Sequence, residues 1–329
     1  MIKINKNSTI YIACPPNTYT GGPELLHQLA FKLNTRGLNA KIFYFPIKYK
    51  SDPTLGEFKE YIDSFSTNIK DDTNNILIVP ELLTELLSDY KKIQKVIWWL
   101  SVDFYKIRIS GRKEKLKMFF RINKVFNIFN SKMRKQIDLH LVQSKYAEEY
   151  LKNYNISNIK YLSDYLRKDF IDKAENLELK NKLDLVLYNP KKGLLFTQKL
   201  IKQFPHINWK PIVNYTPNEV VELIASSKVY IDFGFHPGKD RIPRESVLLK
   251  CCLITNKQGS AFYNEDVPIL EEFKFDELNC DINEIGQKIQ NCISNYDEEI
   301  KKFENYRLEI LRQENNFDSE IDFVFKSSM

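Results

Sequence analysis

The sequence predicts an α/β protein with two doubly wound parallel sheets, each covered by helices on both faces. Short apolar runs alternate with amphipathic stretches along most of the 329 residues, the pattern of parallel strands joined by helices. The chain is long enough for two domains of about 100–200 residues each. A polar segment rich in Asp, Glu, Lys and Asn, residues 168–184, separates two series of such alternations. We therefore expect an N-terminal domain over 1–165 and a C-terminal domain over 166–311.

The N-terminal domain is predicted to begin with a strand, a glycine-containing loop and a helix. The strand covers 9–13, and the loop contains Gly21 and Gly22. Pro23 suits the first helical position, because its φ is already helical and the N–H that proline lacks would be unpaired there. This places the helix at 24–36. A glycine pair permits close approach of the backbone to a ligand, but the GxGxxG spacing of a dinucleotide site is absent.

The rest of this domain continues the alternation of strands and helices. Apolar runs rich in β-branched residues predict strands, and apolar residues at helical spacing predict helices. Ser144 is expected to cap the second of these helices through its side-chain oxygen. The predicted strands are 40–45, 75–79, 95–100 and 137–142, and the predicted helices are 82–90 and 145–153.

The C-terminal domain repeats the pattern, with a loop and a helix after each strand. A basic loop, Asn189-Pro190-Lys191-Lys192-Gly193, follows its first strand. The tail over 282–325 carries apolar residues at roughly helical spacing and is predicted to be mostly helical. The predicted strands are 185–188, 208–213, 228–233 and 251–255, and the helices before the tail are 194–203, 219–226 and 246–250.

A charged loop, 235–246, lies between one of these strands and the next helix. The carboxyl edge of a parallel sheet is where open α/β folds bind ligands. Backbone N–H groups at a helix start favour anions, and neighbouring cations strengthen that preference. The loop therefore predicts a site for a phosphorylated ligand, with Glu245 available to accept from a sugar hydroxyl. Its candidate ligand-binding residues are His236, Lys239, Arg241, Arg244 and Glu245.

Composition narrows the class of protein. With 43% hydrophobic and 28% charged residues and no apolar run of 18, the chain is expected to be globular and soluble, without a transmembrane helix. The N-terminus lacks the apolar core of a secretion signal. Five cysteines without CxxC spacing favour a reducing cytoplasm, and they indicate neither a disulfide framework nor a zinc site.

Positive charge is concentrated between residues 106 and 135, within a formal net charge of +6. Phenylalanines interleave with these cations, and Glu114 alone opposes them. Three interpretations stay open. The segment is an amphipathic helix with a solvated basic face, or a surface that meets anionic lipid at the inner face of the membrane. Nucleic acid is the third, but no motif for binding it accompanies the charge, so we expect no such partner.

Four segments resemble the GT-B glycosyltransferases, enzymes that use nucleotide sugars. Gly21-Gly22-Pro23-Glu24 is similar to their N-terminal glycine loop, and 189–193 is similar to the loop that opens their C-terminal domain. Residues 244–255 resemble the donor-site segment E-A-x-x-x-G-x-P-V-I, and 257–261 resemble the glycine-containing loop that follows it. The resemblance spans nearly the whole chain. It implies two Rossmann-like domains, with residues 312–329 as a helix packing back toward the N-terminal domain.

The resemblance also implies roles for individual residues. The basic residue of the 189–193 loop, Lys191 or Lys192, would meet the donor diphosphate, and Glu245 would contact the nucleotide ribose. Enzymes of this family stabilise the leaving nucleotide with protein groups, so the resemblance implies no essential metal and no cofactor. The nucleotide-binding residues expected on both grounds are Gly21, Gly22, Lys191, Lys192, Lys239, Arg241, Arg244 and Glu245.

The chain departs from the family pattern just before the donor segment. Retaining members often carry a further Glu, and at that position, before Glu245, this chain has Pro237. Retention of configuration is therefore not supported. His236-Pro237 is similar to the His-Pro element of bacterial transferases that use CMP-activated acidic sugars. His236 is accordingly a candidate catalytic residue that could bind phosphate or the sugar ring, and the identity of the donor stays open.

An inverting enzyme also needs a base for the acceptor hydroxyl. Asp103, which follows the strand 95–100, is our candidate, with Glu81 and Glu24 as rivals. We expect a metal-independent cytoplasmic glycosyltransferase acting on a glycan or lipid-linked acceptor, by analogy in bacterial surface-polysaccharide synthesis. A nucleotide-sugar epimerase of the same fold and a non-catalytic sugar-nucleotide or glycan-binding protein are the alternatives.

Overall fold

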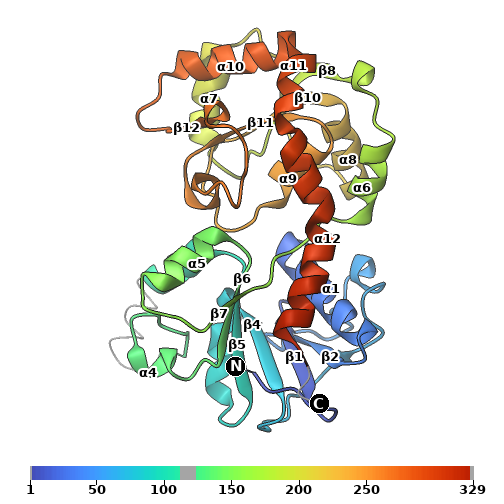
Figure 1. The fold of residues 1–329 in the computed structure, drawn as a ribbon, viewed down its shortest axis with the longest axis vertical. Coiled ribbons are helices and arrows are strands. Elements are labelled where there is room, and N and C mark those ends of the chain that lie inside the picture. The colour runs from blue at the N-terminus through green and yellow to red at the C-terminus, as the bar shows by residue number, and fades with distance from the viewer. Residues whose placement is uncertain (1, 112–123, 327–329) are drawn as a thin grey trace. The chain divides into compact units, whose positions relative to one another are not determined.

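The computed structural model describes residues 2–111 and 124–326, and contacts divide the chain into two compact units. Unit 1 comprises Met1–Asp164 and Asn315–Met329, and unit 2 comprises Tyr165–Glu314. Each unit contains a parallel sheet with helices (Figure 1), which confirms the predicted α/β fold class. Part of the basic segment lies outside the described residues, namely Arg112, Lys113, Lys115, Lys117 and Arg121.

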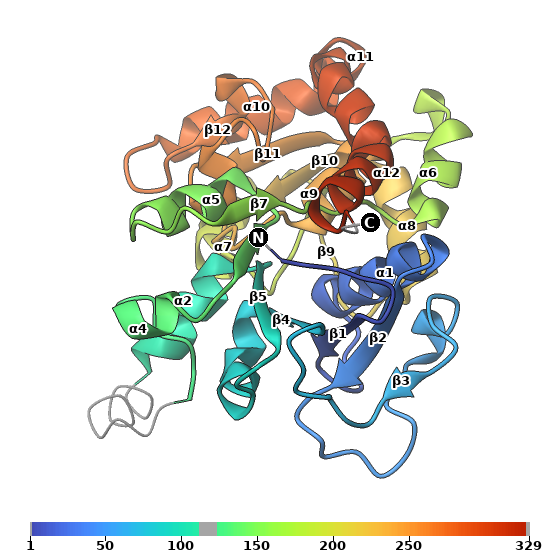
Figure 2. The same ribbon diagram turned by 60° about the horizontal axis from the view of Figure 1, so that its bottom comes forward.

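Seven strands of the described chain form the sheet of unit 1, in the order β3-β2-β1-β4-β5-β6-β7. Neighbouring strands are parallel, and Figure 2 shows β5, β4, β1 and β2 side by side. The order turns back between β1 and β4, so the sheet is doubly wound. The strands are β1 (Thr9–Cys14), β2 (Asn39–Tyr44), β3 (Phe65–Ser66), β4 (Ile76–Pro80), β5 (Gln94–Trp99), β6 (Leu139–Val142) and β7 (Ile159–Tyr161).

Trp98 and Trp99 show how both faces of this sheet are covered. Successive side chains of a strand point to opposite faces. Trp99 meets Tyr105 of α2 edge-on, with ring centroids 4.9 Å apart, whereas Trp98 stacks on Phe317 of α12. The helices and 3₁₀ segments of this unit are α1 (Gly21–Thr35), η1 (Gly56–Phe58), η2 (Glu81–Asp89), α2 (Val102–Ser110), α4 (Ser131–Arg134), α5 (Lys145–Lys152) and the end of α12 (Glu304–Val324).

Polar contacts hold the end of α12 on unit 1. Glu320 accepts from the backbone N–H and the hydroxyl of Ser163, at 2.6 and 2.7 Å. Arg36 of α1 pairs with Asp318 at 2.9 Å. The helix starts in unit 2 and ends in unit 1, since the boundary between the units falls after Glu314.

In unit 2, the described residues form a five-stranded parallel sheet in the order β12-β11-β10-β8-β9. Its strands are β8 (Leu183–Tyr188), β9 (Trp209–Pro211), β10 (Ser227–Asp232), β11 (Cys252–Asn256) and β12 (Lys274–Phe275). Its helices are α6 (Lys168–Glu175), α7 (Leu194–Gln203), α8 (Pro217–Ala225), α9 (Arg241–Leu248), α10 (Ile282–Ser294), α11 (Tyr296–Glu299) and the start of α12, with 3₁₀ segments η3 (Leu179–Asn181), η4 (Gly259–Phe262), η5 (Glu271–Phe273) and η6 (Ile300–Phe303).

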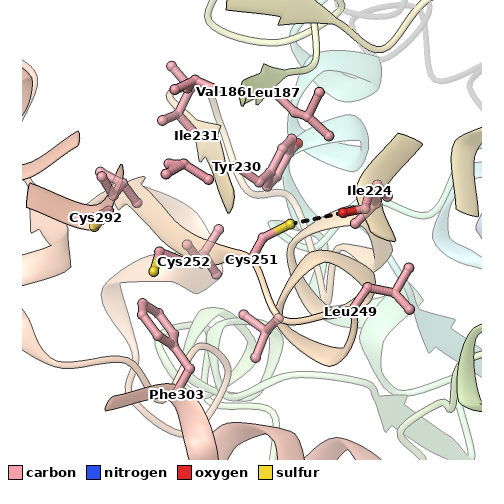
Figure 3. Close-up of a cluster of buried hydrophobic side chains, with 14 of the residues drawn as sticks. Val186, Leu187, Ile224, Tyr230, Ile231, Leu249, Cys251, Cys252, Cys292 and Phe303 are labelled. Atoms are coloured by element: carbon pink, nitrogen blue, oxygen red, sulfur yellow. Dashed lines mark hydrogen bonds between the residues drawn. The ribbon is translucent and has the colours of Figure 1, made fainter. Parts of the chain in front are cut away.

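The core of unit 2 is a layer of aliphatic and aromatic side chains between the sheet and its helices. Figure 3 shows part of it, where Val186 of β8 and Ile231 of β10 gather with Cys251 and Cys252. The thiol of Cys251 donates to the carbonyl of Ile224 at 3.3 Å (Figure 3). All five cysteines are free thiols, four of them buried, so they act here as small core residues.

A buried lysine joins the ends of two helices in this unit. Lys182 donates to the carbonyls of Ile224, Ser227 and Leu249, at 3.2, 2.8 and 2.5 Å. Two of these carbonyls belong to the C-terminal ends of α8 and α9, where the helix dipole favours a cation. The lysine therefore fixes the far end of α9, the helix whose start carries Arg241.

Two helix starts differ from the prediction. α1 begins at Gly21, so the glycine pair forms its first turn instead of a loop. α9 begins at Arg241 instead of residue 246, which places Arg244 and Glu245 inside the helix. Pro243 is compatible with this start, because proline is tolerated in the first turn.

Other differences have local causes. The predicted helix 82–90 is the 3₁₀ segment η2, which is kinked at Leu83. The strands β3, β7 and β12 were not predicted, because each has only two or three residues and shows no periodicity.

Candidate functional site

Three loops meet backbone to backbone at the carboxyl edge of the unit 2 sheet. Gly193, with a φ of 54°, is so confined that an added Cβ would lie 0.9 Å from the carbonyl oxygen of Phe233. At Gly259, with a φ of 55°, an added Cβ would lie 2.1 Å from the carbonyl oxygen of His236. Glycine at both positions is what lets the loops touch. These are the β8, β10 and β11 loops, which cover 189–193, 233–240 and 257–259.

Hydrogen bonds from the β11 side hold the β10 loop at three carbonyl groups. The side-chain amide of Asn256 donates to the carbonyl of Gly234 at 2.6 Å. The backbone N–H of Ser260 donates to the carbonyl of His236 at 2.9 Å, and its hydroxyl donates to that of Gly238 at 2.7 Å. The path of the β10 loop is therefore set by its neighbours.

Four buried or half-buried charged side chains form a network within these loops. The ammonium of Lys192 lies 2.5 Å from Asp240 Oδ2 and 3.7 Å from Asp232 Oδ2. Burial works against charge on this lysine, but the two carboxylates outweigh it and raise the pKa of Lys192. Burial likewise raises the pKa of Asp240, but Lys192 and His236 lower it further, and the carboxylate stays ionised. An ion pair thus joins the β8 loop to the β10 loop.

The surroundings of His236 favour its charged form. Its side chain is fully buried, with Nε2 3.2 Å from the carbonyl oxygen of Asp232 and Nδ1 3.3 Å from Asp240 Oδ2. Nε2 is within hydrogen-bond reach of the carbonyl, whereas Nδ1 makes no hydrogen bond to the described residues and faces the Asp240 carboxylate as an ion-pair partner. Burial lowers the pKa of His236, but the charges of Asp232 and Asp240 outweigh it and raise the pKa above its ordinary value. With His236 protonated, two cations balance two anions.

The same side chains are potential metal ligands. Among the described residues, Asp232, His236 and Asp240 offer ligand atoms that all lie within 4.8 Å of one another. A metal ion would have to displace the ammonium of Lys192, which already contacts both carboxylates. We therefore assign these carboxylates to Lys192 and His236 and propose no metal here.

Two helices at this edge begin without a side-chain cap. In the part of the chain that the structure describes, α7 follows Gly193, which has no side chain, and α9 follows Asp240, whose carboxylate makes no capping bond. By contrast, α8 is closed by a capping box of Thr216 and Glu219. Uncapped N–H groups and the positive end of the helix dipole suit an anion. Lys192 thus lies beside two helix starts that have no side-chain cap in the described chain.

The remaining predicted cations lie on the same loops. Lys191 is exposed in the β8 loop, whereas Lys239 and Arg241 are half-buried beside the start of α9. Together with Lys192 and His236 they make the sequence around the start of α9 rich in cationic side chains. Glu245 lies close by on α9 and is buried, with 9% of its surface exposed.

Arg244 has a different place from the predicted one. Its side chain is 1% exposed and donates to Gln313 at 2.8 Å and to the carbonyls of Lys239 and Asp240 at 3.0 and 3.2 Å. Because the guanidinium is bound to protein groups, we assign it to holding the loop and no longer to contact with phosphate.

Gly21 and Gly22 form the first turn of α1 in unit 1, after Thr20, which makes no side-chain cap. A Cβ added to Gly22 would meet Leu100 at 3.7 Å, an ordinary contact. The fold therefore does not require this glycine in the way that it requires Gly193. What remains for a ligand is an open helix start.

The three candidate bases of unit 1 differ in access. Asp103 Oδ1 accepts from the Tyr146 hydroxyl at 2.6 Å and lies 3.2 Å from the Lys106 ammonium, with its side chain 19% exposed. Glu81 is 1% exposed, accepts from a backbone N–H, and burial raises its pKa to about 7. Glu24 is also buried. Asp103 is the most accessible of the three.

Sequence reasoning missed several residues of the unit 2 site. Asp232, at the end of an apolar strand, and Asp240 flank His236 at intervals of four residues, and that spacing was a usable signal. Asn256 and Ser260 carried no signal, because their role is to bind carbonyl groups of a loop distant in the sequence.

Comparisons with known proteins bear on the fold. No protein-family model matches the sequence, and no curated protein matches it. HepE from Anabaena, in complex with UDP-glucose, matches at a TM-score of 0.59 and 11% identity over 96% of this chain and 99% of its own. A glycosyltransferase from Rickettsia africae matches at a TM-score of 0.65 and 15% identity, over 98% of this chain and 100% of its own. Sucrose-phosphate synthase from Thermosynechococcus elongatus matches at a TM-score of 0.63 and 11% identity, over 97% of this chain and 98% of its own.

These similar structures are glycosyltransferases with the GT-B fold, and the likeness covers nearly all of the chain. The chain therefore has the GT-B fold, as the sequence resemblance implied. At 11–15% identity, the comparison establishes the fold, and the chemistry has to be argued from the residues.

The charge on His236 predicts a pH dependence of stability. Its folded pKa is raised above the unfolded value of about 6.5. The stabilisation is therefore complete below that unfolded value and is lost as pH rises through the folded pKa, at up to about 1.4 kcal/mol per pH unit. In urea unfolding, the free-energy difference between wild type and His236→Gln should be larger at pH 6 than at pH 9. His206→Gln, at an exposed histidine, is the control; a pH-independent difference for His236→Gln would show that His236 is neutral.

Proposed function

We propose that the protein is a metal-independent glycosyltransferase whose nucleotide-sugar donor binds at the carboxyl edge of unit 2. One observation carries the proposal: two uncapped helix starts, α7 and α9, lie on either side of Lys192 within loops that glycines bring into contact. The GT-B fold supports it, because HepE, which has this fold, was solved with UDP-glucose.

Transfer would break the bond between the anomeric carbon and the donor phosphate oxygen, while the acceptor oxygen bonds to that carbon. The leaving nucleotide gains negative charge, which the N–H groups of the two helix starts and the ammonium of Lys192 would stabilise. Lys191, Lys239 and Arg241 would add attraction for the phosphates. In this proposal Glu245 accepts from a ribose hydroxyl, and no residue needs a metal ion.

We propose Asp103 as the base that takes the proton of the acceptor hydroxyl. Tyr146 and Lys106 both contact Oδ1 of this carboxylate, which orients the group and leaves Oδ2 for the acceptor. Glu81 is less suited, because its carboxyl group is buried and accepts from the N–H of Leu100.

Binding of the nucleotide can be tested without knowing the acceptor. UDP is the first ligand to try, and CMP is the second because of the His236-Pro237 element. A ligand at 100 times its dissociation constant should add about 2.7 kcal/mol of stability, seen as a rise in melting temperature. The double variant Lys191→Met, Arg241→Met should weaken binding at least about ten-fold, because two charged contacts to phosphate are removed.

Lys199→Met is the matched control, since this lysine is exposed on α7 away from the loops. Equal affinity in the double variant and the control would place the nucleotide elsewhere. If neither UDP nor CMP, nor UDP-, GDP-, dTDP- or ADP-linked sugars, stabilise the wild type, the proposed function is refuted.

Loss of the base should slow transfer without weakening donor binding. Asp103→Asn is expected to lower kcat at least about 100-fold, because general-base catalysis contributes about 10²–10⁴-fold. The measurement is nucleotide release from the donor that binds, with Asp63→Asn, at an exposed carboxylate of unit 1, as the control. Retained turnover in Asp103→Asn, with loss in Glu81→Gln, would move the role to Glu81.

We further propose that the enzyme works at an anionic membrane surface on a glycan or lipid-linked acceptor of bacterial surface-polysaccharide synthesis. Phe104 and Ile107 of α2 are 43% and 59% exposed, and Phe129 is 64% exposed. Among the described residues, the exposed Lys132 and Lys135 make no ion pair. Exposed apolar side chains with nearby cations favour binding to an anionic bilayer. None of the described helices is long and apolar enough to cross the bilayer.

Vesicle sedimentation tests this surface. The protein should bind vesicles of phosphatidylcholine with 30% phosphatidylglycerol at low salt, and Ile107→Ser with Phe129→Ser should reduce the bound fraction several-fold. Leu278→Ser, at a residue of unit 2 that is 89% exposed, should leave binding unchanged. Equal binding of wild type to vesicles of phosphatidylcholine alone would contradict a role for the cations.

A further inference from the structure

Arg244 connects three segments of unit 2. It projects from α9, its Nη2 and Nε groups donate to the carbonyls of Lys239 and Asp240, and its Nη1 group donates to the side chain of Gln313. With 1% of its surface exposed, the guanidinium depends on these protein acceptors. A buried charged group that loses an acceptor is strongly destabilised, so the geometry of the three partners is tightly held.

Gln313 is a side-chain partner of Arg244 that lies outside the loop. It is buried, 6% exposed, on α12. The boundary between the two units falls one residue further on, after Glu314. Gln313 therefore bonds α12 to Arg244 of α9, and Arg244 in turn bonds to the carbonyls of Lys239 and Asp240.

The connection continues to the charged network. Asp240, whose carbonyl accepts from Arg244, also holds the ammonium of Lys192 at 2.5 Å and faces His236 at 3.3 Å. A shift of the guanidinium would move the backbone of Asp240 and with it both carboxylate contacts. Lys192 would then lose its place between the starts of α7 and α9.

We propose that Gln313 and Arg244 are positioning residues that set the geometry of the Lys192–Asp240–His236 network. Through this geometry they set the affinity of unit 2 for a nucleoside diphosphate. The part concerning affinity rests on the proposed function; the part concerning geometry does not. Because Gln313 belongs to α12, a change at this helix reaches the phosphate-binding loop through one hydrogen bond and one side chain.

The matched variants are Gln313→Leu, which removes the acceptor, and Gln313→Glu, which keeps one. Asn316→Leu makes the same kind of change at an exposed amide on the same helix and is the control. The melting temperature of each variant is measured first, to show that every variant is folded at the temperature of the binding and titration measurements.

The first measurement is an NMR titration of His236 without any ligand. The chain has four histidines, so His236→Gln assigns the resonance. Lys192, Asp232 and Asp240 are the charged groups that face this ring. In Gln313→Leu the pKa of His236 should fall toward its ordinary value, because Asp240 moves away, while Gln313→Glu and Asn316→Leu should titrate like wild type. If His236 titrates in Gln313→Leu as it does in wild type, the Gln313–Arg244 hydrogen bond has only a structural role, and the proposal is overturned.

The second measurement is the dissociation constant of UDP by calorimetry. Gln313→Leu should bind UDP about ten-fold more weakly, with Gln313→Glu within about two-fold of wild type. A changed His236 titration with unchanged UDP affinity would overturn the link to binding. If wild type itself binds no nucleotide, the proposed function fails, and the titration alone decides the positioning role.

Discussion

The carboxylate of Asp240 is the contact on which the site of unit 2 depends. It holds Lys192 of the β8 loop and faces His236 of its own loop, so it joins two loops that are distant in the sequence. A half-buried carboxylate without a cation would be costly, and here Lys192 and His236 both lie close to Asp240 and to Asp232. As the residue before α9, Asp240 could also have capped that helix, but its carboxylate makes no such bond. The Asp240 side chain therefore balances the charge of Lys192 and His236, and it leaves the start of α9 without a cap.

Glycine contacts make this arrangement rigid. Gly193 lies against the carbonyl of Phe233, and Gly259 lies against that of His236, so each loop limits the position of the next. Donors held in place before the reaction stabilise developing charge without the cost of reorganising. In the proposed function, Lys191, Lys239 and Arg241 add attraction for a phosphate to loops whose positions are already fixed. An ammonium already lies between the carboxylates, and a metal ion would have to displace it.

Much of the fold could be predicted from the sequence, because alternating apolar runs and helical periodicity are local signals. Lys192, Gly193 and His236 lie in loops that follow predicted strands, so their place at the carboxyl edge of the sheet could be predicted as well, while their roles stay predictions. The role of Arg244 could not be predicted, since its partner Gln313 is 69 residues away and only the folded chain brings the two side chains together. The strands β3, β7 and β12 were too short for periodicity. What the sequence did not reveal is therefore the pairing between distant segments.

A crystal structure of the protein with UDP tests the central claim most directly. The account predicts the diphosphate at the starts of α7 and α9, with oxygens about 2.7–3.2 Å from the backbone N–H of Leu194 or Leu195 and from the ammonium of Lys192. Asp240 should keep its contact with His236. A diphosphate bound away from both helix starts, with Lys192 still held only by Asp232 and Asp240, would contradict the account.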